Sequence, residues 1–268
     1  MSQSTSAQQP SKEQSKWLDG GRQESGNLHA AESGGPRIVP NSSGHVATSL
    51  ESSRIQADPC GHGSCTAPAL AAVDSITDDD ALFVRSLTER FMSNPAGDDD
   101  IRLVQRQLGR YPRGMVSVGA RCAVCGAPFV VVTRPMLTDG TPFPTTCYLT
   151  SPEAVKAVSH VEAAGRMAQF NELLAQDERV KSGYVRAHRM YLAFRSELAG
   201  RLGDDERHIA GISAGGMPTR VKCLHALVAQ SLVMGNGINP IGDMTLELIS
   251  DEFQPGVCRC SIHEAQSR

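Results

Sequence analysis

Cys122 and Cys125 are separated by two residues and followed by Gly126, and they form the clearest chemical motif in this sequence. At this spacing two thiolates can reach one tetrahedral zinc ion, and the glycine permits a tight backbone turn. Two thiols make only half of such a site. The candidates for its other ligands are Cys147, Cys223 and His225. We therefore predict a zinc site built on Cys122, Cys125, Cys147 and Cys223, the alternative being that these cysteines are small buried apolar side chains.

Cys223 and His225 offer a second kind of chemistry. A helix predicted over residues 218–234 places Cys223 near a helix N-terminus, where the dipole and the charges of Arg220 and Lys222 favour the thiolate. The same helix would direct Cys223 and His225 to opposite sides, so we expect only one of them to bind an ion. Cys223 is thus either a metal ligand or a reactive thiol, with His225 as a second reactive group.

A glycine-rich loop, residues 211–216, leads into this helix. Exposed backbone N–H groups at Gly215 and Gly216, together with the helix dipole, Arg220 and Lys222, would suit a phosphate or a carboxylate. The loop matches neither of the standard glycine patterns that bind nucleotides. We predict an anion site for a phosphate-bearing ligand here, the alternative being a linker that lets the helix pack closely.

Two further cysteine pairs have ligand-like spacing but lie outside the expected domain. Cys60 and Cys65 are in the N-terminal part, and Cys258 and Cys260 are close to the C-terminus. Segments without a predicted core can capture a metal adventitiously, so no function is assigned to either pair.

Composition restricts the partners and the compartment. Lys and Arg number 26 against 29 Asp and Glu, a formal charge of −3, which gives no overall basic field for nucleic acid or an anionic membrane. The sequence contains neither a signal peptide nor an apolar run of about 18 residues, so we expect a cytoplasmic protein without a membrane segment. In the cytosol the eight cysteines should be reduced.

Three regions differ in composition. Residues 1–76 contain one aromatic residue, Trp17, and no lasting apolar period, which predicts a disordered tail. Residues 77–253 should form one domain, and residues 254–268 a C-terminal tail.

Within the domain, strands are predicted at 115–118, 129–133 and 143–150, where β-branched and aromatic residues gather, with a turn at Asp139 and Gly140. Helical segments precede and follow them, including 178–199 and a last helix at 243–253. Because the helices are segregated from the strands, we predict the α+β class: a small three-stranded antiparallel sheet packed with about five to six helices. Asp243 is expected to open the last helix after a turn that begins at Asn239.

Several short motifs resemble one family. They are QLGR (107–110), PRG (112–114), RC (121–122), DGTPFPT (139–145), YLT (148–150), VS (158–159) with Glu162, GGMP (215–218), RVKCLH (220–225) and NPIGD (239–243). Over about residues 98–252 the chain resembles the bacterial DUF501 family, whose function is unknown. The resemblance implies that Asn239 and Asp243 take part in a site, and relatives commonly carry histidine where this chain has Gln230. It also implies a link to cell division or polyphosphate metabolism, because family genes often lie beside those of a septum-formation initiator and an exopolyphosphatase.

Two hypotheses of function follow. The first is a cytosolic accessory protein that binds zinc, an anion or both. The second is a hydrolase or transferase acting on a phosphorylated small molecule, with Arg220 and Lys222 holding the anion and Cys223 or His225 reacting. The sequence has no standard catalytic signature, so the second hypothesis is the alternative.

Overall fold

The computed structural model describes residues 76–260. The tail predicted over residues 1–76 lies outside them except for its last residue, and so do Cys60 and Cys65. The predicted α+β class with a three-stranded antiparallel sheet is confirmed. The α-helices are α1 (Asp78–Met92), α2 (Asp98–Leu108), α3 (Pro152–Ala163), α4 (Arg166–Gln176), α5 (Glu178–Leu202), α6 (Leu224–Met234) and α7 (Pro240–Leu248). The strands are β1 (Met115–Arg121), β2 (Pro128–Thr133) and β3 (Cys147–Leu149).

The sheet has the order β1-β2-β3, and every residue of the central strand β2 is buried. A strand with partners on both edges and cover on both faces needs apolar side chains throughout, which its β-branched run supplies. The third strand is shorter than the predicted 143–150 segment. Pro142 and Pro144 lack the N–H that a ladder requires, so pairing with β2 begins only at Cys147.

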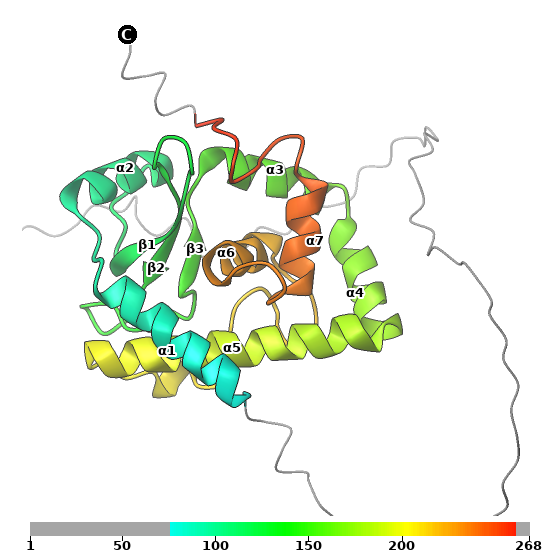
Figure 1. The fold of residues 1–268 in the computed structure, drawn as a ribbon, viewed down its shortest axis with the longest axis horizontal. Helices are drawn as coiled ribbons and strands as arrows, with labels where there is room; N and C mark the ends of the chain where they lie inside the picture. The colour runs from blue at the N-terminus through cyan, green and yellow to red at the C-terminus, as the bar shows by residue number, and fades with distance from the viewer. Residues whose placement is uncertain (1–75, 261–268) are drawn as a thin grey trace, which may run out of the picture. The chain divides into compact units, whose positions relative to one another are not determined.

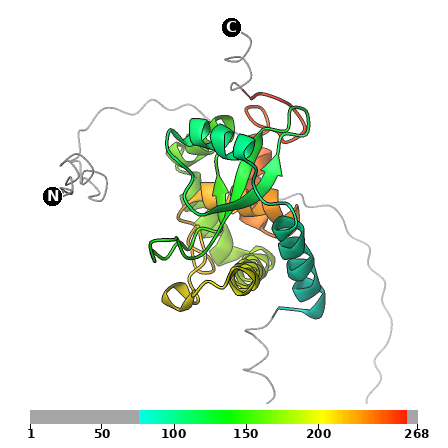
Figure 2. The same ribbon diagram turned by 90° about the vertical axis from the view of Figure 1, so that its left-hand side faces the viewer.

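Helix α6 lies at the centre of the domain. It contacts all three strands as well as α3 and α7, and Figure 1 shows it nearly end-on between the sheet and α7. Eight of its residues are buried, as expected for a helix that is apolar on every side. α7 approaches it so closely that a Cβ on Gly242 would lie 2.4 Å from the Leu227 carbonyl oxygen. In the view of Figure 1, α5 runs below the sheet, α6 and α7. Figure 2 shows α5 nearly end-on with α1 beside it.

α6 begins at Leu224, so the helix predicted from residue 218 was too long by six residues. The preceding residues form a compact loop in which the Gly215 carbonyl accepts hydrogen bonds from the N–H groups of Lys222 (2.7 Å) and Cys223 (3.3 Å). Asn171 from α4 bonds both backbone groups of Val221, at 2.8 and 3.1 Å. These contacts hold the backbone of Cys223 extended, at φ −151° and ψ 110°, so the proline does not open the helix.

α7 also begins earlier than expected, because Asn239 and not Asp243 caps it. The Asn239 side chain accepts the Gly242 N–H at 3.0 Å and donates to the Gln230 side chain at 2.8 Å, and both side chains are fully buried. Asp243 accepts the Gly237 N–H at 2.8 Å. The roles that the structure shows for Asn239 and Asp243 are therefore to fix the start of α7 against α6. Within residues 76–260, no helix combines the length and the apolarity needed to cross a bilayer.

Candidate metal centre

The Cys122–Cys125 pair lies on the tight connection between β1 and β2. The Cys122 N–H donates to the Ala127 carbonyl at 2.8 Å, and the Gly126 N–H donates to the Cys122 carbonyl at 2.9 Å. Gly126 has φ +75°, in the left-handed region that favours glycine, as the sequence motif predicted. The turn thereby brings both thiols to one side.

The other half of the cluster comes from the C-terminal segment. The thiols of Cys122, Cys125, Cys258 and Cys260 all lie within 4.8 Å of one another, and we call this group the four-thiol cluster. Figure 1 shows the red C-terminal segment approaching the loop between β1 and β2. The sequence assigned residues 254–268 to a tail and gave these two cysteines no function. In the structure, residues as far as Cys260 lie against the domain.

Contacts before Cys258 explain how the segment reaches the turn. The ring of Phe253 packs edge-on against Phe129 of β2, with ring centroids 4.9 Å apart. The Ala123 N–H then donates to the Pro255 carbonyl at 3.3 Å. Residues 254–257 form a turn, closed by a hydrogen bond from the Val257 N–H to the Gln254 carbonyl at 3.1 Å. The chain is thus led back over Cys122 and Cys125.

The pKa values of three of the four thiols are shifted, in different directions. Burial acts to raise the pKa of Cys122, but hydrogen bonds from the backbone N–H groups of Cys125 and Val124 and from the thiols of Cys125 and Cys258 lower it to about 7. Burial raises the pKa values of Cys125 and Cys260. A metal ion bound by these four sulfur atoms would displace the protons of the thiols.

The other two predicted ligands do not join this group. Cys147 is fully buried within β3, and burial raises the pKa of its thiol well above the usual value, so it is an inert core side chain. Cys223 lies at the N-cap position of α6 and belongs to a different cluster. Of the four predicted ligands, Cys122 and Cys125 therefore lie together, and the thiols beside them are those of Cys258 and Cys260 and not those of Cys147 and Cys223.

A second cluster consists of Glu162 on α3 with Cys223 and His225 at the start of α6, and we call it the mixed cluster. The Nδ1 atom of His225 lies 3.2 Å from the Glu162 Oε1 atom and 4.0 Å from the Cys223 Sγ atom. The sequence predicted that Cys223 and His225 would point apart on one helix. They converge because Cys223 precedes the helix in extended backbone, where side-chain directions no longer follow the helical period.

In the mixed cluster, Cys223 and His225 shift each other's pKa values. The hydrogen bond with His225 lowers the pKa of the Cys223 thiol. The same hydrogen bond raises the pKa of His225 to about 9, helped by the charge of Glu162 and the Val155 carbonyl and opposed by burial. The contact between Cys223 and His225 thus favours the charged form of each, the thiolate and the imidazolium.

The residues of the predicted anion site, Gly215, Gly216, Arg220 and Lys222, lie in the loop before α6. The carbonyl groups of Gly215 and Gly216 accept hydrogen bonds from the backbone N–H groups of Arg220, Lys222 and Cys223. The first N–H of α6, at Leu224, donates to the Glu162 carboxylate at 2.6 Å. Glu162 thus lies at the N-terminus of α6, and the Arg220 and Lys222 side chains are exposed.

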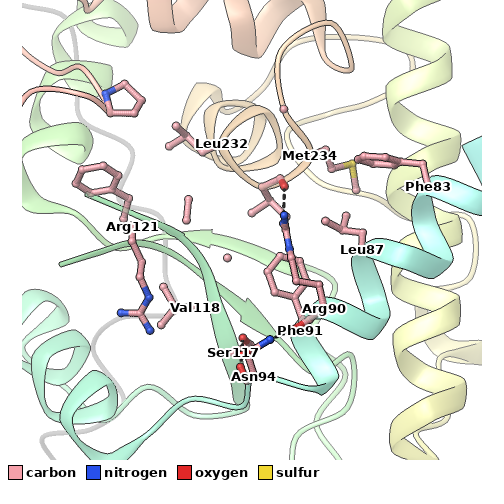
Figure 3. Close-up of a pocket in the computed structure, with 16 residues that line it drawn as sticks. Phe83, Leu87, Arg90, Phe91, Asn94, Ser117, Val118, Arg121, Leu232 and Met234 are labelled. Atoms are coloured by element: carbon pink, nitrogen blue, oxygen red, sulfur yellow. Dashed lines mark hydrogen bonds between the residues drawn. The ribbon is translucent and has the colours of Figure 1, made fainter. Parts of the chain in front are cut away.

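A cavity of about 700 Å³ lies between α1, β1 and the end of α6. Its lining is largely apolar, with Leu87, Phe91 and Met234 among the side chains in Figure 3. The charged groups there are engaged, since Arg121 pairs with Asp100 at 2.7 Å and Arg90 donates to the Val233 carbonyl at 3.5 Å. None of the lining residues that the structure describes is a cysteine, histidine or carboxylate, so the candidate chemistry lies outside this cavity.

Comparison with family models matches residues 118–247 to the family described as "Protein of unknown function (DUF501)". This confirms the resemblance drawn from the sequence motifs. The mixed cluster lies wholly inside the matched range, whereas the four-thiol cluster takes Cys258 and Cys260 from beyond it. Neither the curated proteins nor the solved structures contain a match to the chain.

Proposed function

We propose that this chain, which resembles the DUF501 family over residues 118–247, is a cytosolic zinc-binding accessory protein whose four-thiol cluster holds one structural zinc ion. The observation that carries the proposal is the convergence of four sulfur atoms within 4.8 Å of one another. Four sulfurs at about 2.3 Å from a tetrahedral zinc ion are about 3.8 Å apart, so a small contraction of the cluster would suffice.

The donor set favours zinc over harder cations. Four thiolates with no oxygen or nitrogen ligand are typical of closed structural sites, which leave no position for a substrate. Such a site would fasten the segment after Phe253, whose residues are mostly exposed, to the turn between β1 and β2. The proposed role is therefore to shape a surface for a partner. The gene neighbourhood of the family associates that role with cell division or polyphosphate metabolism.

The alternative is a hydrolase or transferase that uses Cys223 and His225, and one observation favours it, namely the 4.0 Å contact between Sγ and Nδ1. In a nucleophile–histidine–carboxylate chain, however, the nucleophile and the carboxylate use opposite nitrogens of the ring. Here Glu162 and Cys223 both approach Nδ1. This arrangement supports the enzymatic hypothesis less well than it supports metal ligation.

The proposal is tested by metal analysis of the full chain, purified without a polyhistidine tag, in a Cys223→Ser background that removes the mixed cluster. We expect about one zinc per chain after dialysis, because four thiolates bind zinc tightly. Cys125→Ser or Cys260→Ser should abolish it, and the control Cys147→Ala, whose thiol lies outside the cluster, should retain it. Retention of zinc by the first two variants, or its absence from the background protein, would refute the proposal.

A further inference from the structure

The mixed cluster brings together three different donor atoms from two elements that lie far apart in the sequence. The Glu162 Oε1, Cys223 Sγ and His225 Nδ1 atoms all lie within 4.8 Å of one another, at the contact between α3 and the start of α6. Oxygen, sulfur and nitrogen donors at this separation can meet around one ion with little movement. The cluster shares no residue with the four-thiol cluster.

Contacts at Nε2, the ring nitrogen that faces away from Glu162 and Cys223, fix the orientation of the His225 ring. Its Nε2 atom lies 3.1 Å from the Val155 carbonyl oxygen, which can only accept, so Nε2 carries a proton. The Ser159 hydroxyl lies beside the same nitrogen at 3.2 Å. Nδ1 therefore faces Glu162 and Cys223, and a bound metal ion would replace the proton on this nitrogen. A histidine whose other N–H donates to a backbone carbonyl is the usual arrangement for a metal ligand.

The carboxylate is fixed as well. The N–H of Leu224, at the first turn of α6, donates to Glu162 Oε1 at 2.6 Å. This hydrogen bond and the positive end of the α6 dipole hold the carboxylate beside Cys223 and His225. Oε1 also lies 3.2 Å from His225 Nδ1, and once a metal ion replaces the proton of that nitrogen, Oε1 keeps a lone pair for the same ion.

We propose that Glu162, Cys223 and His225 form a second divalent-metal site, distinct from the four-thiol site, with three protein ligands and a fourth position open to water. The mixed donor set suits zinc or a similar borderline cation. The side chains of His225 and Glu162 are 25% and 23% exposed, so water can reach the ion. Three protein ligands with one exchangeable position distinguish this site from a closed structural one.

The test is a titration of the full chain with Co²⁺ after its tight site has been filled with zinc. We expect one Co²⁺ per chain, with a sulfur-to-metal charge-transfer band of about a quarter of the intensity of a four-thiolate site, because only one thiolate is bound. Cys223→Ser and Glu162→Gln should each abolish this band. Serine suits the N-cap position of Cys223, so the first variant should fold normally. Cys147→Ala is the control and should bind as the parent does.

The reactivity of the Cys223 thiol provides a second test, which does not depend on the four-thiol cluster. Bound metal should protect Cys223 from alkylation by iodoacetamide by at least about tenfold, since the thiolate that reacts is also the ligand. Cobalt that shows a four-thiolate spectrum and is lost only in Cys258→Ser would overturn this proposal while leaving the first one intact. Alkylation of Cys223 at a rate that metal does not change would also overturn it, because it would identify a reactive thiol.

Discussion

Cys258→Ser, or treatment of the full chain with a chelator, is expected to lower the free energy of unfolding by about 3 kcal/mol. A metal that binds only the folded chain stabilises it by about 2.7 kcal/mol at one hundred times its dissociation constant and by about 4.1 kcal/mol at one thousand times. For a domain of this size the loss corresponds to a fall of about 6–12 °C in the melting temperature. Calorimetry of parent and variant, with and without chelator, measures it.

The stability losses of double variants provide a control for this prediction. Cys122→Ser and Cys258→Ser should together destabilise little more than either alone, because both act through the same ion. Cys122→Ser and Cys223→Ser belong to different clusters, so their effects should add. Additive losses for the first pair would show that the C-terminal segment and the turn do not share a metal.

Arg195→Ala is the second change with a large expected effect, about 3–5 kcal/mol of destabilisation. The Arg195 side chain is 1% exposed and donates to the Glu206 carboxylate at 2.8 Å. It also donates to the Ile209 carbonyl at 2.8 Å and to the Ile212 carbonyl. Its removal leaves two carbonyls and the Glu206 carboxylate, which is 23% exposed, without this partner, and breaking an ion pair with a buried guanidinium costs about this much. The melting temperature should fall by about 6–20 °C.

Arg201→Ala is the matched control on the same helix. Arg201 pairs with Glu89 and Glu197 but is 45% exposed. Exposed ion pairs contribute about 0–1 kcal/mol because water and salt screen them. Thermal or urea unfolding of both variants compares the two positions directly. Equal losses at Arg195 and Arg201 would contradict the role that the structure gives to the buried guanidinium, which is to fix the loop leading into residues 211–223.

Local signals predicted the elements of this fold well. The helix predicted over residues 178–199 is α5, and the run of β-branched residues at 130–133 lies in the central strand. These features depend on neighbouring residues, so the sequence displays them. The start of α6 was predicted wrongly because its loop is held by Asn171 of α4 and by the Tyr184 hydroxyl of α5, which donates to the Arg220 carbonyl. Such distant partners leave no periodic pattern in the sequence.

Only the part of the four-thiol cluster that depends on neighbouring residues was predicted from the sequence. The tight turn of Cys122 and Cys125 was expected from the spacing of these residues. Their partners Cys258 and Cys260 were not expected, because the approach of the C-terminal segment depends on the packing of Phe253 against Phe129. The Cys-x-Cys spacing of residues 258–260 was the available signal. Glu162 was noted only as part of a motif, since a carboxylate on one helix gives no sign that it will meet the start of another.

Zinc K-edge X-ray absorption on the Cys223→Ser protein tests the central claim most directly, because it counts the atoms bound to the metal. We predict four sulfur ligands at about 2.3 Å and no nitrogen or oxygen in the first coordination shell. In a protein that also carries Cys258→Ser, the four-sulfur signal should disappear. A spectrum with nitrogen or oxygen ligands at about 2.0 Å, or a sulfur count that Cys258→Ser leaves unchanged, would contradict a four-thiol zinc site.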